Sequence, residues 1–202
     1  MEPFVSFTSK AVPLPIDNID TDAITPIGRV LEGRETMIRY AFEPLRFGPD
    51  GELRSDCPLN DPAYAGARIL IAGDNFACGS SRETAVWAIQ GMGYRAVIAP
   101  SFGGIFFTNC LKGGLLPVAL PAADVAALTA HAASGGEITI DLEGQRVSGG
   151  GVSAGFDISP LRKEALLGGL DDLGLILKRD AASAAFEARD RQARPWVYLG
   201  SS

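Results

Sequence analysis

The residues best suited to chemistry lie in one short stretch, residues 75–84, which reads Asn-Phe-Ala-Cys-Gly-Ser-Ser-Arg-Glu-Thr. Two adjacent hydroxyl groups, those of Ser80 and Ser81, are followed directly by the guanidinium of Arg82. A guanidinium binds a carboxylate through two parallel hydrogen bonds. In a chain with a net charge of −6, Arg82 is the local cation at which we expect an anionic ligand to bind.

The same stretch has a purely structural interpretation, a capping box at the start of a helix over residues 81–92. Ser80 would be the N-cap and Glu83, three residues later, would complete the box, each satisfying a free backbone amide. This interpretation does not explain Arg82, because a positive charge is unfavourable at the positive end of a helix dipole. An anion docked at that end would make the charge favourable. We therefore expect an anion site, with the capping box as the alternative.

Alternating strands and helices surround this stretch. The continuously apolar run Ala67–Ala72 predicts a buried strand, followed by the helix over 81–92, a strand over 95–99, a helix over 102–112 and a strand over 115–120. Such alternation indicates right-handed βαβ units and a parallel sheet. Ligands of open α/β sheets bind beyond the carboxyl ends of the strands, where residues 75–84 would lie.

The two ends of the chain are predicted to be richer in β-structure and loops. Residues 1–66 contain many prolines and favour short extended segments, with a loop tip at 46–52. Beyond residue 120 the sequence predicts a helix at 122–133, a hairpin of strands 137–142 and 145–148, a strand near 153–158, a helix capped by Ser159-Pro160 and a polar helix at 180–194. The fold class is α/β, with a mostly parallel central sheet, flanking helices and β-rich ends.

Composition excludes several classes of protein. A length of 202 residues with 47% hydrophobic residues favours one domain with a real core. Lysines and arginines are scattered, so no nucleic-acid partner is expected. The N-terminus has no signal-peptide pattern and no run of about 18 apolar residues occurs, so we expect a cytoplasmic protein without membrane contact.

The positions of the cysteines and of the single histidine argue against metal sites and against a Ser-His-Asp hydrolase. Cys57, Cys78 and Cys110 are widely spaced and form no Cys-x-x-Cys motif, so neither a zinc site nor a cluster-binding site is expected on this chain. His131 is the only histidine and is expected at the surface of a helix, which makes a Ser-His-Asp hydrolase hard to build.

Four stretches resemble a known family in the right order. Residues 75–83 resemble the Gly-Ser-Ser-Arg-Glu signature of the swivelling domain shared by aconitases and isopropylmalate isomerases. Residues 18–26, residues 99–110 with 114–117, and residues 169–177 are similar to the N-terminal, central and closing segments of the bacterial small subunit. The resemblance implies that residues 1–202 form a single swivelling β/β/α domain like the aconitase C-terminal domain, with a C-terminal helical tail from about residue 180.

The resemblance also implies a function. The chain would be the small subunit of a hydro-lyase that interconverts 2-isopropylmalate and 3-isopropylmalate by dehydration and rehydration, in leucine biosynthesis. It would bind no cofactor itself. A large subunit would carry a [4Fe–4S] cluster acting as a Lewis acid, in a heterodimer or heterotetramer, and the substrate would be a small dicarboxylate.

Individual residues receive roles from the same resemblance. Ser80 would be the base that removes a proton from carbon, Ser81 would stabilise the charged neighbourhood, and Arg82 would bind a substrate carboxylate. Asp22 would orient an active-site histidine of the large subunit, and Arg34, in a substrate-recognition loop, would reach a carboxylate. Without the resemblance, Asp22 is better explained as an Asx-turn residue. Arg34 would then be a solvated loop residue.

Two departures from the family pattern leave the substrate open. Thr84 stands where many members have histidine, and the segment 32–47 does not match the usual bacterial form. Alternatives are therefore a paralogous dehydratase subunit for citramalate or 2-methylmalate, or a small-anion-binding module without a catalytic partner.

Overall fold

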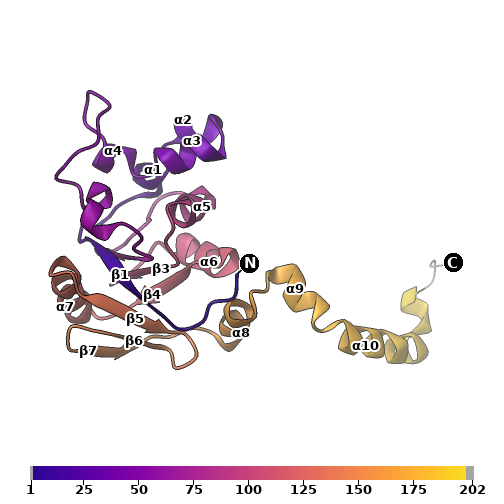
Figure 1. Cartoon of the computed structure of the whole chain (residues 1–202). Coiled ribbons are helices and arrows are strands. Elements are labelled where there is room, and N and C mark those ends of the chain that lie inside the picture. Colours follow the sequence, from indigo (N-terminus) through magenta and orange to yellow (C-terminus); the bar gives the residue numbers. More distant parts are fainter. Residues whose placement is uncertain (1, 199–202) are drawn as a thin grey trace.

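A seven-stranded sheet organises the chain in the computed structural model, which describes residues 2–198 (Figure 1). The strand order is β4-β3-β2-β1-β5-β6-β7. The strands are β1 (Phe7–Leu14), β2 (Ile69–Ala72), β3 (Ala96–Ala99), β4 (Leu116–Ala119), β5 (Glu137–Asp141), β6 (Arg146–Gly149) and β7 (Val152–Gly155).

Strand β1 joins a parallel half of the sheet to an antiparallel half. Its residues 11–14 pair in parallel with β2, and β2, β3 and β4 continue the parallel half. Its residues 7–10 pair antiparallel with β5, which begins the meander β5-β6-β7. Pro13 lies in the half that pairs only with β2, and a proline is tolerated in a strand with one side open. The predicted parallel centre with β-rich ends is confirmed.

Hydrophobic cores lie on both faces of the sheet. In β2, Leu70 and Ala72 belong to one core, while Ile69 and Ile71 belong to the other. The alternation arises because successive side chains of a strand point to opposite faces. All four are buried, so the strand reads as an unbroken apolar run.

Helices cover the two faces unequally (Figure 1). The short helices of the N-terminal segment and helix α5 contribute to the core around Leu70, whereas α7 and α8 contribute to the core around Ile69. The helices are α1 (Thr21–Ile24), α2 (Ile27–Leu31), α3 (Arg34–Arg39), α4 (Glu43–Arg46), α5 (Thr84–Gly91), α6 (Gly104–Gly113), α7 (Ala122–Ala133), α8 (Pro160–Gly168), α9 (Asp172–Leu177) and α10 (Asp180–Ala193). Three 3-10 helices cover Pro58–Asn60, Pro62–Tyr64 and Pro195–Tyr198.

Most predicted elements are confirmed with small shifts in their ends. Helix α7 begins and ends at the predicted residues, and Ser159 caps α8 by accepting a hydrogen bond from the Arg162 amide (3.4 Å). The loop tip at 46–52 is closed by a bridge between Phe47 and Leu53. Strand β7 is shorter than predicted and ends at Gly155.

His131 is partly exposed, so it lies at the surface of α7, but its ring is more enclosed than expected. Its ring packs against Gly136 and Gly150, and its Nε2 lies 3.1 Å from the Glu137 carbonyl oxygen. The glycines leave room for the ring because they have no side chains. This packing anchors α7 to the antiparallel half of the sheet.

The C-terminal tail projects from the body (Figure 1). It is helical over Asp180–Ala193, as predicted, and residues 199–202 of the predicted tail lie outside the described residues. Across residues 2–198, no helix combines the length and apolar character needed to cross a membrane.

Candidate active site

The loop that follows β2 runs between two other segments of the chain. On one side, the Ala77 amide donates to the Ile19 carbonyl oxygen (2.7 Å). On the other, the Phe76 amide donates to the Ser101 carbonyl oxygen (3.0 Å). Backbone hydrogen bonds on both sides fix the path of this loop beyond the carboxyl end of β2, so the next residues start from a defined position.

Two glycines near the loop have a structural reason, close backbone packing at Gly103 and a positive φ at Gly79. A Cβ atom on Gly103 would lie 2.5 Å from the Ala77 carbonyl oxygen, so no other residue fits without a shift. Gly79 has a φ of 97°, a conformation that residues with side chains rarely adopt. The turn at Gly79 then presents Ser80 next to α1.

The structure brings Ser80, Arg82 and Asp22 together, and their predicted roles stay predictions. Arg82 Nε donates to Ser80 Oγ (2.9 Å), and Arg82 Nη2 forms an ion pair with Asp22 Oδ1. The Arg82 side chain is 25% exposed and that of Asp22 is 67% exposed. These contacts use two of the five N–H groups of the guanidinium. Within residues 2–198, Nη1 makes no hydrogen bond or ion pair, so the guanidinium keeps donors for a carboxylate in addition to Ser80 and Asp22.

The capping-box interpretation is wrong. Helix α5 begins at Thr84, its N-cap is Glu83, and no side chain caps it. Ser80 and Arg82 therefore precede the helix, and Arg82 is not in its first turn as expected. The helix starts later than predicted because of a contact between distant parts of the chain. The Ser80 amide donates a hydrogen bond to the hydroxyl of Thr21 (3.0 Å), which keeps Ser80 outside the helix.

The Asx-turn interpretation of Asp22 is also wrong, because its neighbour Asp20 performs that task. Asp20 Oδ1 accepts from the Ala23 amide (2.6 Å) and caps α1. The Asp22 carboxylate is left to face Arg82.

Ser81 and Arg34 lie apart from this contact. The Ser81 carbonyl oxygen accepts from Asn109 Nδ2 (3.3 Å), and within residues 2–198 its hydroxyl makes no hydrogen bond. Arg34 is exposed at the start of α3 and, in the same part of the chain, makes neither a hydrogen bond nor an ion pair. The structure does not bring Arg34 to Ser80, and its role stays a prediction.

Arg29, five positions before Arg34, is committed to internal partners. Its Nε and Nη2 donate to the two carboxylate oxygens of Glu43 (2.9 and 2.6 Å), and its guanidinium lies 4.0 Å from the centre of the Tyr40 ring. The hydrogen bonds from Arg29 lower the pKa of the Glu43 carboxyl group. The pair ties α2 to α4.

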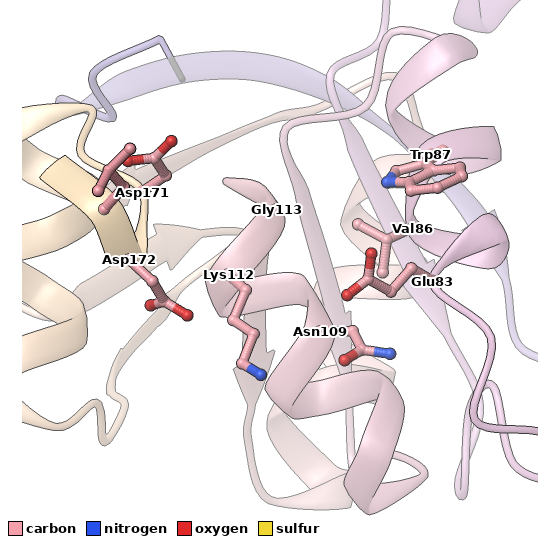
Figure 2. Close-up of a pocket in the computed structure, with 9 residues that line it drawn as sticks. Glu83, Val86, Trp87, Asn109, Lys112, Gly113, Asp171 and Asp172 are labelled. Carbon is pink, nitrogen blue, oxygen red and sulfur yellow. The ribbon is translucent and has the colours of Figure 1, made fainter.

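A pocket of about 350 Å³ lies beside the loop (Figure 2). Figure 2 shows Asp171 and Asp172 on one side, Glu83 and Trp87 on the other, and residues of α6 between them. Ser80, Arg82 and Asp22 do not line it. The pocket therefore adjoins the predicted site without containing its reactive groups. It is lined by Glu83, Val86, Trp87, Asn109, Lys112, Gly113, Asp171, Asp172 and Leu173.

Sequence reasoning missed two residues that hold the loop, Thr21 and Asn109. Thr21 contacts Ser80 and Asn109 contacts Ser81. The one hint in the sequence was that Thr21 directly precedes Asp22. No local pattern around Thr21 or Asn109 predicts a contact with a loop that is distant along the chain. Thr84 is the residue that departs from the family pattern. Its hydroxyl oxygen lies 3.3 Å from the hydroxyl oxygen of Thr25.

The cysteines do not form a ligand set. Cys57 and Cys110 are buried, Cys78 is half-buried, and all three are free thiols. Burial raises the pKa of the Cys110 thiol, which disfavours the thiolate that binds iron. In the described part of the chain, no group of three or more His, Cys, Asp or Glu side chains is placed to hold a metal ion. An iron–sulfur cluster does not fit these residues.

Comparison with known proteins decides the family. The sequence matches the aconitase C-terminal domain family over residues 1–123, which is more than half of the chain. It is 48% identical to the 3-isopropylmalate dehydratase small subunit of Rhodospirillum centenum, over 98% of this chain and 99% of that one. The chain belongs to the family of 3-isopropylmalate dehydratase small subunits. A second member, from Paramagnetospirillum magneticum, is 46% identical over 98% of this chain and 100% of its own.

A solved structure of the family has the same fold. The crystal structure of 3-isopropylmalate dehydratase from Methanocaldococcus jannaschii superimposes with a TM-score of 0.66 at 25% identity. The match covers 90% of this chain and 99% of that chain. The family resemblance predicted from the four sequence stretches is confirmed.

Proposed function

We propose that this chain is the small subunit of a hydro-lyase that interconverts 2-isopropylmalate and 3-isopropylmalate by dehydration and rehydration, in leucine biosynthesis. The observation that carries the proposal is the contact of Ser80 with Arg82, beside Asp22, in a member of the dehydratase small-subunit family. This arrangement pairs a candidate base with a carboxylate-binding cation.

Arg82 orients the substrate in the proposed reaction. One substrate carboxylate binds the edge formed by Nη1 and Nη2, with one hydrogen bond from each nitrogen. The other edge already holds Ser80 Oγ at 2.9 Å from Nε, so the bound substrate and the base share one rigid group. Such positioning lowers the entropic cost of reaching the transition state.

Ser80 handles the proton. Its Oγ, as the alkoxide, takes the proton from the substrate carbon, and the C–H electron pair forms the double bond as the hydroxyl leaves the adjacent carbon. The Lewis acid for that hydroxyl would be the cluster proposed for the large subunit. In rehydration Ser80 Oγ returns the proton to one carbon while the hydroxyl adds to the other. The Arg82 Nε–H donates to this oxygen, and a hydrogen bond to a charged form stabilises that form. Ser81, whose exposed hydroxyl has no partner within residues 2–198, is proposed to turn that hydroxyl toward the charged groups when the substrate is bound.

Asp22 and Arg34 complete the proposed site. Asp22 pairs with Arg82 through one carboxylate oxygen, and its 67% exposed side chain is accessible to a histidine of the large subunit. Arg34 binds the second substrate carboxylate from α3, in keeping with its exposure and the lack of any ion-pair partner for it within residues 2–198.

The partner is a large subunit that holds a [4Fe–4S] cluster, in a heterodimer or heterotetramer. The small-subunit names of the relatives support a large-subunit partner, and the separated cysteines of this chain support placing the cluster there. The ligand of this chain is then a small dicarboxylate alone. We also propose a cytoplasmic location for this chain.

Reconstitution tests the proposed function. The chain is co-expressed with the large subunit from the same organism, purified anaerobically, and assayed with 2-isopropylmalate and with citramalate; the chain alone is the control. We expect a stable complex that isomerises 2-isopropylmalate, while the chain alone is inactive. A complex that prefers citramalate, or a chain that forms no complex, contradicts the proposal.

A further inference from the structure

Thr21 forms hydrogen bonds with the loop on both sides of Gly79. Its side-chain oxygen accepts a hydrogen bond from the Ser80 amide (3.0 Å), and its own amide donates to the Cys78 carbonyl oxygen (2.9 Å). Thr21 is 1% exposed, so neither contact competes with bulk water. Hydrogen bonds shielded from water hold geometry more firmly than exposed ones.

The residue between these two contacts cannot hold the loop by itself. Gly79 has no side chain and adopts a φ of 97°, a region in which glycine is free to move. A bond to the Ser80 amide is therefore what fixes the direction in which Ser80 leaves the turn. That direction decides whether Ser80 Oγ lies within hydrogen-bond distance of Arg82 Nε.

Thr21 is itself held in place. The Thr25 hydroxyl donates to the Thr21 carbonyl oxygen (3.1 Å), and the preceding residue, Asp20, caps the helix. The following residue, Asp22, pairs with Arg82. The first turn of α1 thus contacts Ser80 through one residue and Arg82 through the next.

We propose that Thr21 is a positioning residue whose hydroxyl fixes Ser80 relative to Arg82. The proposal rests on the proposed function, because it assigns Thr21 an effect on the Ser80 base. Thr21 does not touch the substrate. It acts through the Ser80 backbone, so its loss is expected in turnover and not in substrate affinity.

The competing interpretation is that Thr21 merely fills the core and satisfies a polar group. The two differ in what the hydroxyl does. Serine and alanine at position 21 both lack the threonine methyl group and differ only in the hydroxyl. Comparing Thr21→Ser with Thr21→Ala therefore isolates the contact to the Ser80 amide.

The test measures kcat, KM and Tm for both variants in the complex with the large subunit. We expect Thr21→Ala to lower kcat by about 10- to 100-fold, because a misplacement of about 1 Å at a reacting group has effects of that order. KM should stay within about threefold, and Thr21→Ser should keep kcat within about threefold of wild type. Thr129→Val is the control, since it removes a half-buried hydroxyl bonded to the Val125 carbonyl oxygen (2.8 Å) on α7.

Each outcome is decisive. Equal kcat values for Thr21→Ser and Thr21→Ala overturn the proposal, as does a loss confined to KM. If the alanine variant fails to assemble, Thr21→Val against the wild-type threonine makes the same comparison with the volume retained. An inactive wild-type complex counts against the proposed function, whereas an active wild type with an active Thr21→Ala variant counts against Thr21 alone.

Discussion

Arg82 has contacts on two sides before any substrate binds. Its Nε donates to Ser80 and its Nη2 pairs with Asp22. A planar guanidinium can hold these two groups and a carboxylate at once, because its donors point along separate edges. A lysine ammonium at the same position is a single point charge and cannot reproduce these directions.

Replacing Arg82 by lysine should therefore abolish most activity while the fold survives. Losing one partner of a desolvated charge pair costs about 2–5 kcal/mol, which corresponds to a fall of roughly 30- to several-thousand-fold in kcat/KM. The Tm should change little, because the exposed Asp22 makes the ion pair a minor contributor to stability. Kinetics and calorimetry on Arg82→Lys and Arg82→Ala are the measurements. A lysine variant with normal kinetics, or one that melts far below wild type, would show that Arg82 is structural.

The sequence predicted some members of the candidate site but not its local geometry. Ser80 and Arg82 stood out by residue type and Asp22 through the family resemblance, and these three lie together. Arg34, also predicted, lies apart from them. The helix start was misplaced because the Ser80 amide bonds to Thr21, a contact between distant parts of the chain. A capping box is a local pattern, and a local pattern does not register a competing acceptor from another element.

Among the elements, the parallel half of the sheet was the most predictable. Strands β2, β3 and β4 are buried on both faces, so their apolar runs and the glycines that follow the helices mark them clearly. Strand β1 was harder, since its proline at position 13 argues against a central strand. It is tolerated because that half of β1 pairs on one side only.

The ion pair between Arg29 on α2 and Glu43 on α4 predicts that the stability of the chain depends on pH. Arg29 lowers the pKa of Glu43 in the folded chain, so the contribution of Glu43 is present above its unfolded pKa and is lost as the pH falls. Glu43→Gln should lower Tm by about 2–4 °C near neutral pH, and the difference should shrink as the pH falls through the lowered pKa of Glu43. Glu52→Gln is the matched control, because Glu52 has no ion-pair partner within residues 2–198. A difference that persists unchanged in acid would mean that the ion pair is not its source.

At the scale of the whole molecule, the tail contributes little to the stability of the body. None of the described side chains of α10 is buried, and the helix projects from the sheet and its covering helices (Figure 1). By contrast, α8 places Ala165 and Leu166 in the core.

Removing residues 180–202 should leave Tm within about 2 °C of the full chain, because almost no apolar surface is uncovered. Removing residues 159–202 should unfold the chain or lower Tm by more than about 10 °C, since buried side chains of α8 are lost. Scanning calorimetry of both truncated chains makes the comparison. A large loss of stability on removing the tail alone would show that it packs on the body in solution.

The most direct test of the account is the turnover of Ser80→Ala in the complex with the large subunit. A lost proton-transfer base lowers kcat by about 10²–10⁴-fold, and the loss belongs in kcat because the base acts in the transition state. KM should change little. The Tm should also hold, because Ser80 is not a helix cap. An Ser80→Ala complex that isomerises 2-isopropylmalate within a few-fold of the wild-type kcat would contradict the account.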